Sequence, residues 1–420
     1  MVAYMVKRVL MIAYHFPPVR GSSGVQRTVA LTRYLPAAGW EPIVLTVSKS
    51  AYPLVSADDS LIPPGTTVSR SFALDAVRHL SIGGRYPRWV GIPDRWASWW
   101  LSAVPRGLAL IRRLKPQLIW STFPIATAHR IGLTLANKSG LPWVADFRDP
   151  MTEQDYPQDP RRRVIFQRLE AEVVARASRC VFVTRSVLDM YRQRYPGEPA
   201  ARMELIPNGF DEEDFLLAAQ QIPIRPAPGD PLRIVHSGLL YSEERNPAEL
   251  FHALAELKRT RSIDALQARI VLRASGYDAQ YRATLKALGI EDLVELAPAL
   301  PYHAALAEMM HADGLVILQA ESCNGQIPAK LYEYLRARRP ILALTHPKGD
   351  TAALLRQLGV GLIGRLDDRH DIKRALSEFL AGIRSGAIGV CTDEQVAAFR
   401  RSAQVQEYAQ LLDSSVAAPR

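Results

Sequence analysis

The segment from Gly314 to Pro340 combines a strand, a polar loop and a helix, and this combination most constrains what the chain can fold into. The apolar run Gly314–Leu318 is typical of a fully buried strand. A polar loop follows at 322–326, and Pro328 suits the first position of a helix because it has no N–H to leave unpaired. At such a junction, unpaired N–H groups and the helix dipole favour an anion. We therefore expect an anion-binding site here.

Two charged residues lie on the first turns of this predicted helix. Lys330 is at the end of the helix where the dipole disfavours a cation, which makes sense if a phosphate binds there too. Glu333 lies one turn further along on the same face, and its carboxylate can accept both hydroxyls of a ribose. The alternative is an ordinary solvated Lys–Glu pair, and the spacing alone leaves both interpretations open.

Length and composition indicate a globular enzyme with two domains. The chain has 420 residues, of which 48% are hydrophobic and 22% charged. No apolar run approaches the ~18 residues that span a membrane, and no cleavable signal is visible, so we expect a cytoplasmic protein. Three widely spaced cysteines predict neither a disulfide framework nor a metal site. The net charge of +10 favours anionic partners, and no nucleic-acid-binding module is legible.

Short apolar runs alternate with helical patterns along most of the chain, which predicts parallel strands joined by helices. Strands are expected at 8–14, 40–46, 117–121, 143–146, 179–184, 293–297 and 314–318, and near Gly361. Residues 232–238 are expected to form a strand that ends in a glycine turn, and residues 268–276 a further strand–helix junction. The stretch from Gln220 to Pro231 holds four prolines and a glycine and predicts an interdomain linker. The pattern indicates an α/β protein with two doubly wound domains.

Polar groups follow several of the predicted strands of the first half. The glycine-containing loop 15–24 lets a ligand approach the backbone, although a tight βα turn is the alternative. Asp146, Arg148 and Asp149 lie at the carboxyl end of a predicted strand, where open sheets bind ligands; an internal salt-bridge cluster is the alternative. His129 is expected on the first turns of a helix, as a ligand contact or as a structural residue.

Residues 85–100 alternate tryptophans with arginines. Tryptophan with arginine suits a membrane interface or a lipid-bearing acceptor. The alternative is a helix whose tryptophans pack on the domain.

Five motifs, in order along the chain, resemble those of family-four glycosyltransferases of the GT-B fold. They are a Pro-Pro-x-x-Gly-Gly-x-x-Arg loop matched by Pro17, Pro18, Ser23, Gly24 and Arg27, the Asp-Phe-Arg-Asp-Pro segment 146–150, the Ile-Pro-Asn-Gly-Phe-Asp turn 206–211, the strand–Gly–loop–Arg unit 232–247, and the Pro-x-Lys-x-x-Glu-Tyr helix 328–334. One position departs from the family. Many members carry a further glutamate where this chain has Gly325, and the nearest candidate, Glu321, lies four residues too early.

The resemblance implies a role for each matched residue. Arg245 and Lys330 would meet the donor diphosphate and serve as the catalytic residues, and Glu333 would bind the donor ribose. Gly238, Ile327 and Leu331 would complete the donor-binding side. The acceptor or phosphate side would comprise Ser22, Ser23, Gly24, His129, Arg148 and Asp149.

The resemblance also implies a GT-B architecture of two Rossmann-like domains facing across a cleft. We expect an N-terminal acceptor-side domain at 1–218, a linker at 219–231, a nucleotide-sugar-binding domain at 232–392, and a C-terminal helix at 393–420 that crosses back to the first domain.

The implied activity is that of a retaining transferase of the hexosyltransferase type. It would use a UDP- or GDP-sugar, with no metal and no permanently bound cofactor. The acceptor would be a glycan, a lipid-linked or a small molecule in cell-surface polysaccharide or glycolipid biosynthesis. The enzyme would be cytoplasmic or peripheral on the inner face of an anionic membrane. Two alternatives stay open: a nucleotide-sugar 2-epimerase on the same fold, and a non-catalytic basic protein that binds membrane surfaces.

Overall fold

The computed structural model describes residues 6–19, 24–56, 61–81, 87–153, 156–221 and 230–417. Contacts divide the chain into two compact units. Unit 1 comprises Met1–Pro207 and Arg401–Arg420, and unit 2 comprises Asn208–Arg400. The division falls earlier than the domain end expected at 218 and later than the one expected at 392. Most of the expected linker, residues 222–229, lies outside the described residues.

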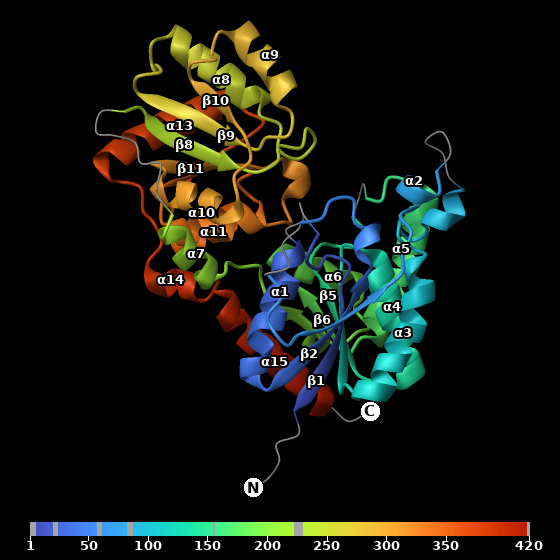
Figure 1. Cartoon of the computed structure of the whole chain (residues 1–420). Helices are drawn as coiled ribbons and strands as arrows, with labels where there is room; N and C mark the ends of the chain where they lie inside the picture. Colours follow the sequence, from blue (N-terminus) through green and yellow to red (C-terminus); the bar gives the residue numbers. More distant parts are fainter. Residues whose placement is uncertain are drawn as a thin grey trace. The chain divides into compact units, whose positions relative to one another are not determined.

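Unit 1 is built on a seven-stranded parallel sheet with the order β3-β2-β1-β4-β5-β6-β7 (Figure 1). The strands are β1 (Lys7–Ile12), β2 (Trp40–Val47), β3 (Thr67–Ser71), β4 (Leu118–Thr122), β5 (Trp143–Phe147), β6 (Arg179–Phe182) and β7 (Met203–Leu205). The helices are α1 (Gly24–Tyr34), α2 (Ala76–His79), α3 (Trp99–Leu114), α4 (Ala126–Ser139), α5 (Pro160–Arg176), α6 (Arg185–Arg194) and α15 (Arg401–Ala417). The core under α3 to α6 lies on one face of the sheet, and α15 packs on the other face through residues such as Val405 and Leu412.

Unit 2 is built on a six-stranded parallel sheet with the order β10-β9-β8-β11-β12-β13. The strands are β8 (Leu232–Ser237), β9 (Ala268–Arg273), β10 (Val294–Ala297), β11 (Gly314–Leu318), β12 (Ile341–Leu344) and β13 (Leu362–Gly364). The helices are α7 (Glu212–Ala219), α8 (Ala248–Arg259), α9 (Asp278–Leu288), α10 (Tyr302–His311), α11 (Ala329–Ala337), α12 (Asp350–Leu358), α13 (Arg369–Ser385) and α14 (Asp393–Ala397). The helices α8, α9 and α13 share one core, and α7, α10, α11 and α12 share the other.

The last part of the chain forms two helices instead of the single helix expected from 393 onward. A capping box between Thr392 and Gln395 starts α14, which belongs to unit 2. The chain leaves the helix at 398–400, where Arg400 bridges Phe210, and resumes as α15 in unit 1. Only this second helix packs in the unit that was expected to receive the C-terminal segment.

The described tryptophans of the 85–100 segment pack inside unit 1. Trp99 is fully buried, and its indole N–H donates to Ser71 Oγ at 2.9 Å. Trp96 lies against Tyr14 with ring centroids 4.5 Å apart, and the indole of Trp100 donates to Thr134 Oγ1 at 2.9 Å. The packed alternative therefore holds for these three, because Trp99 is buried and Trp96 and Trp100 are partly buried against the core of the unit. Within the described residues, none of the helices is long and apolar enough to cross a bilayer.

Candidate functional site

The sheet of unit 2 has its topological switch point between the neighbouring strands β8 and β11. The chain leaves β8 through Gly238 towards α8, which packs on one face of the sheet. It leaves β11 through the loop 319–328 towards α11, which packs on the other face. Open α/β sheets bind their ligands where the two connections diverge. The structure brings three predicted residues, Gly238, Arg245 and Lys330, to this edge.

Lys330 on the first turn of α11 reaches across to the end of β8. Its Nζ lies 3.1 Å from Nε2 of the buried His236, and a Cβ on Gly238 would lie 3.2 Å from the same Nζ. Gly238 has φ +107°, a conformation that favours glycine. The other ring nitrogen of His236, Nδ1, lies 3.0 Å from the carbonyl oxygen of Val316 and donates to it. That bond assigns the neutral tautomer whose Nε2 lone pair accepts from the lysine ammonium.

The surroundings of Lys330 disfavour its charged form. Burial, with a contribution from Arg245 and against the attraction of Glu333, lowers the pKa of Lys330 to about 7. Burial and the charge of Lys330 hold the pKa of His236 well below its usual range. In the part of the chain that the structure describes, no carboxylate forms an ion pair with Lys330. Such a site gains most from a bound anion.

Arg245 lies on the loop that joins β8 to α8. Its backbone N–H donates to the carbonyl oxygen of Tyr241 at 2.7 Å, and its guanidinium lies 5.3 Å from the centre of the Tyr241 ring. Glu244, whose carboxylate is 3.9 Å away, accepts through its backbone from the N–H of Ala320 at 2.7 Å. The two connections of the switch point are thus joined to each other, and Arg245 is held over their junction.

Glu333 is buried, which excludes the solvated Lys–Glu pair. Its Oε1 accepts from the hydroxyl of Tyr302 at 2.8 Å. The next residue, Tyr334, accepts from the backbone N–H of Ser237 at 2.9 Å and ties α11 to the end of β8. Leu331 is buried in the core beneath α11, and Ile327 packs against the same core. Gly238, Lys330 and Glu333 therefore lie near one edge of the sheet, whereas the side chain of Leu331 belongs to the core.

Sequence patterns did not indicate His236 and Tyr302, although both hold predicted site residues. A histidine at the end of a strand, two residues before the glycine turn, was the available signal for His236. Tyr302 has no comparable signal, because only the packing of α10 beside α11 brings it to Glu333.

A pocket of about 280 Å³ with a largely apolar lining and several polar groups lies at the carboxyl ends of β11, β12 and β13 in the same unit. It is lined by Asn246, Ala248, Glu249, Gln319, Ala320, Glu321, His346, Leu366 and Asp367. Glu321 Oε1 lies 3.5 Å from His346 Nε2. The pocket thus places a carboxylate near the loop in which Gly325 replaces the family's further glutamate.

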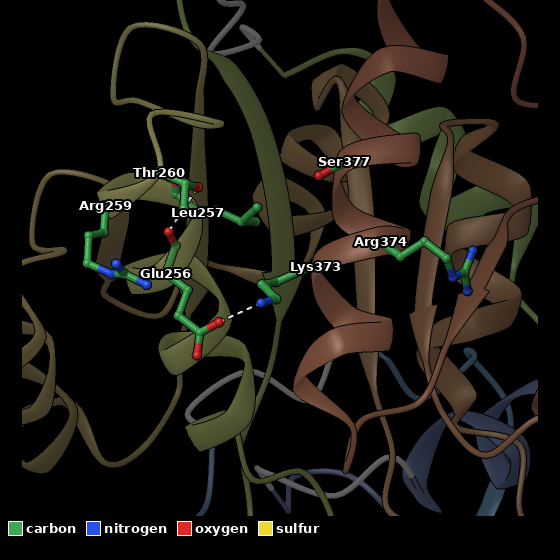
Figure 2. Close-up of a pocket in the computed structure, with 7 residues that line it drawn as sticks. All are labelled: Glu256, Leu257, Arg259, Thr260, Lys373, Arg374 and Ser377. Carbon is green, nitrogen blue, oxygen red and sulfur yellow. Dashed lines mark hydrogen bonds and ion pairs between the residues drawn. The ribbon is translucent and has the colours of Figure 1, made fainter.

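A second hollow of about 280 Å³ lies between α8 and α13 (Figure 2). Its one carboxylate, Glu256, is engaged, because it accepts from Lys373 at 2.5 Å and from Arg369 at 3.2 Å. The hydroxyl of Thr260 donates to the Glu256 carbonyl oxygen at 3.1 Å. This groove has the character of a surface salt-bridge cluster, and we assign it no chemistry.

The predicted acceptor-side residues of unit 1 divide into three groups. Ser22 and Ser23 lie outside the described residues, and Gly24 begins α1. Arg148 and Asp149 follow β5, and burial lowers the pKa of Arg148 and raises that of Asp149. The neighbouring Asp146 is bound instead by Arg27 at 2.9 and 3.3 Å, which is the internal salt bridge of the alternative interpretation.

His129 lies inside the core of unit 1. Its Nδ1 is 2.8 Å from Ser121 Oγ, and its ring centroid lies 4.9 Å from that of Phe147. Burial lowers its pKa to about 3. These surroundings favour a structural role over contact with an acceptor.

No group of three or more metal-ligating side chains occurs among the described residues. The three cysteines are buried free thiols.

The chain resembles known proteins in part of its sequence and in its fold. Residues 22–214 match the family model described as Glycosyltransferase Family 4. The sucrose-phosphate synthase of Thermosynechococcus elongatus is 15% identical over 97% of this chain and 98% of that one, with a TM-score of 0.69. Anabaena HepE in complex with UDP and glucose is 14% identical over 97% and 95%, with a TM-score of 0.59.

A putative UDP-N-acetylglucosamine 2-epimerase from Listeria monocytogenes is 12% identical over 97% of this chain and 96% of that one, with a TM-score of 0.59. The comparison with curated proteins gives no significant match. The predicted fold is thereby confirmed: the chain has the GT-B fold, with two Rossmann-like α/β units. The resemblance to family-four glycosyltransferases is confirmed for residues 22–214, most of which belong to unit 1.

The pKa of Lys330 can be measured through its reactivity. An unprotonated amine is the nucleophile, so Lys330 should be half-reactive near pH 7, whereas an ordinary lysine, with a pKa of about 10.4, stays protonated there. Competitive acetylation between pH 5 and 11, quantified by mass spectrometry, measures the pH at which Lys330 becomes half-reactive. The exposed Lys348 is the reference lysine. His236→Phe should move the midpoint of Lys330 lower, because the ammonium loses its acceptor. Acetylation of Lys330 in step with Lys348 would contradict the desolvated site.

Proposed function

We propose that the protein is a retaining glycosyltransferase of the hexosyltransferase type that moves a sugar from a nucleotide-sugar donor to a hydroxyl group. The observation that carries the proposal is Lys330, a desolvated lysine beside Gly238 and Arg245 at the switch point of unit 2. Two cations at this edge suit a diphosphate. The buried carboxylate of Glu333, three residues from Lys330, suits the ribose next to it. UDP and glucose in HepE support a uridine donor, and GDP-sugars stay the alternative.

In this mechanism the bond between the anomeric carbon and the diphosphate oxygen breaks while Arg245 and Lys330 stabilise the charge that develops on the diphosphate. The acceptor oxygen forms its bond to the anomeric carbon on the same face. Its proton passes to the departing phosphate oxygen, so no protein nucleophile is needed. His236 acts as a positioning residue, because its Nε2 holds the lysine ammonium at the glycine turn.

The pocket lined by Glu321 and His346 is the proposed place for the transferred sugar, because carboxylate and imidazole groups can hold its hydroxyls. Arg148 and Asp149, with the loop Ser22–Gly24, are the proposed acceptor or phosphate contacts of unit 1. The acceptor would be a glycan, a lipid-linked or a small molecule of cell-surface polysaccharide or glycolipid biosynthesis. We propose that the enzyme works in the cytoplasm, at or near the membrane.

A 2-epimerase activity on the same fold is the second candidate, because a putative epimerase is among the similar structures. Epimerisation requires a base that removes a proton from the sugar. His236 is poorly suited, since both its ring nitrogens are engaged, by Val316 and Lys330. Deuterium uptake at C2 of the sugar in heavy water, without an acceptor, would identify an epimerase. Hydrolysis or transfer without deuterium uptake would identify the transferase.

Lys330→Ala and Arg245→Ala should each lower kcat about 10²-fold or more, because each removes a cation that stabilises the leaving diphosphate. The measurement is turnover with an identified donor. Lys348→Ala, at an exposed lysine of the same unit, is the matched control and should turn over like the wild type. Undiminished turnover in either site variant would remove that residue from the mechanism.

Glu333→Gln should raise KM for the donor with kcat little changed, because the ribose hydroxyls are not where charge develops. Isothermal titration with the nucleoside diphosphate measures the same loss directly. Tyr302→Phe, which removes only the hydroxyl that donates to Glu333, should have a smaller effect. An unchanged diphosphate affinity in Glu333→Gln would refute the ribose assignment.

Activity should survive an excess of EDTA, because we assign the diphosphate charge to Arg245, Lys330 and the N-terminus of α11. The assay compares initial rates before and after chelation, followed by addition of Mg²⁺ or Mn²⁺. A rate that falls on chelation and returns with the metal would overturn the metal-independent mechanism.

A further inference from the structure

The net positive charge of the protein comes from unit 1. Residues 1–207 and 401–420 contain 30 of the 52 basic and 17 of the 42 acidic residues, which gives this unit a net charge of +13. Residues 208–400 contain the other 22 basic and 25 acidic residues, a net charge of −3. A nucleotide-binding role of unit 2 therefore does not account for the basic character of the chain.

Within unit 1, the excess is concentrated on the helices α3, α4 and α5. These helices lie side by side along one face of the sheet (Figure 1). Together they carry ten arginines and lysines and two acidic residues. One of the two acids, Glu170, is buried and accepts from Arg194 at 2.6 Å, which leaves Glu172 as the exposed acid within the three helices.

The basic side chains of this face are directed to solvent. Exposed members are Arg106, Arg112, Arg113, Lys115, Lys138, Arg161 and Arg168. Among the described residues, no ion pair engages any of these seven. Like charges gathered on one face repel one another, so the arrangement lowers stability unless an anionic partner compensates.

The opposite face of unit 1 shows no such excess. There Lys7 pairs with Asp413 of α15. The guanidinium of Arg27 is buried against Asp146. The unit is therefore polarised, with one neutralised helix layer and one basic helix layer.

Exposed apolar side chains lie beside the basic layer, at the start of α3. Leu101 is 69% exposed and Phe72 is 58% exposed. The hydroxyl of Ser102 donates to the carbonyl oxygen of Phe72, which brings these two residues to one place. Val77 on the adjoining α2 is 43% exposed. Basic side chains with exposed apolar neighbours are the combination that amphipathic membrane-binding surfaces use.

We propose that the α3–α4–α5 face of unit 1 binds an anionic lipid surface, with Phe72 and Leu101 entering the headgroup region. The basic face, defined by the seven exposed residues named above, supplies the attraction. Leu101 and Val77 offer no ring on which a base could stack, and exposed aliphatic side chains beside basic groups favour lipid over nucleic acid. Trp99 is buried, and the rings of Trp96 and Trp100 are partly buried against Tyr14 and beside Thr134.

The proposal concerns a surface of unit 1 and is independent of the donor site in unit 2. Bound to membrane, the enzyme would find a lipid-linked acceptor at high local concentration. Vesicle binding therefore tests the surface of unit 1, and donor binding separately tests the proposed function of unit 2.

Co-sedimentation with vesicles tests the surface. The wild type should bind phosphatidylglycerol-containing vesicles in 0.1 M salt, and weakly or not at all to pure phosphatidylcholine. Arg106→Gln/Arg112→Gln/Arg113→Gln should reduce the partition coefficient on the order of 10²-fold, because each charge near such a surface contributes about fivefold. Glutamine is a good helix former, so α3 should remain intact, and thermal unfolding checks this.

A matched control removes the same charge elsewhere. Arg259, Arg282 and Lys286 are exposed on α8 and α9 of unit 2. The triple glutamine variant at these positions should bind vesicles like the wild type. Phe72→Ser/Leu101→Ser, which keeps every charge, should reduce binding at least tenfold.

Three results would overturn the proposal. The first is equal loss in both triple variants, which would indicate net charge instead of a defined surface. The second is undiminished binding of Phe72→Ser/Leu101→Ser. The third is failure to bind anionic vesicles together with salt-sensitive binding of RNA or duplex DNA, which would assign the face to nucleic acid.

Discussion

The buried guanidinium of Arg27 holds unit 1 together. It donates to both oxygens of Asp146 and to the backbone carbonyl oxygens of Ile206 and Pro207. It also donates to the hydroxyl of Tyr408 on α15 at 2.7 Å. Four segments that are remote in sequence thus share one charge, and burial makes loss of any partner costly, about 3 to 5 kcal/mol for the carboxylate. The C-terminal helix and the loop after β5, from which Arg148 and Asp149 extend, depend on this interaction.

Most of the fold could be predicted from the sequence, because fully buried parallel strands are continuous apolar runs bounded by polar turns. The apolar run Gly314–Leu318, for example, was predicted as a strand and forms β11. The last helix could not be predicted correctly. Residues 398–400 contain neither proline nor glycine, and the break there reflects pairing with the chain near Phe210 and a change from one unit to the other. Such a break is decided by tertiary contacts rather than by local propensity.

The candidate site, too, could be predicted only in part from the sequence. Lys330 and Glu333 stand in one local motif, and their helix position already indicates an anion and a ribose. His236 and Tyr302 could not be found in this way, because each meets its partner only through the packing of separate elements. Lys330 is also more than a matched position: a histidine lone pair and a glycine turn hold it, and burial lowers its pKa. A solvated lysine at the same helix position would satisfy the motif without this strain.

The two units use positive charge in opposite ways. Unit 2 has a net negative charge and pairs many of its arginines, as Arg273 does with Glu308 and Arg369 with Glu249. It reserves desolvated positive charge for one small edge of its sheet. Unit 1 leaves many cations unpaired and spreads them over a helix layer exposed to solvent. The net charge of +10 predicted a protein that binds a membrane surface, and the tryptophans of 85–100 predicted where on the protein that surface lies. The indoles pack against the unit, so the tryptophans do not mark the membrane-binding surface. The proposed surface lies where cations lack ion-pair partners and where Phe72 and Leu101 are exposed.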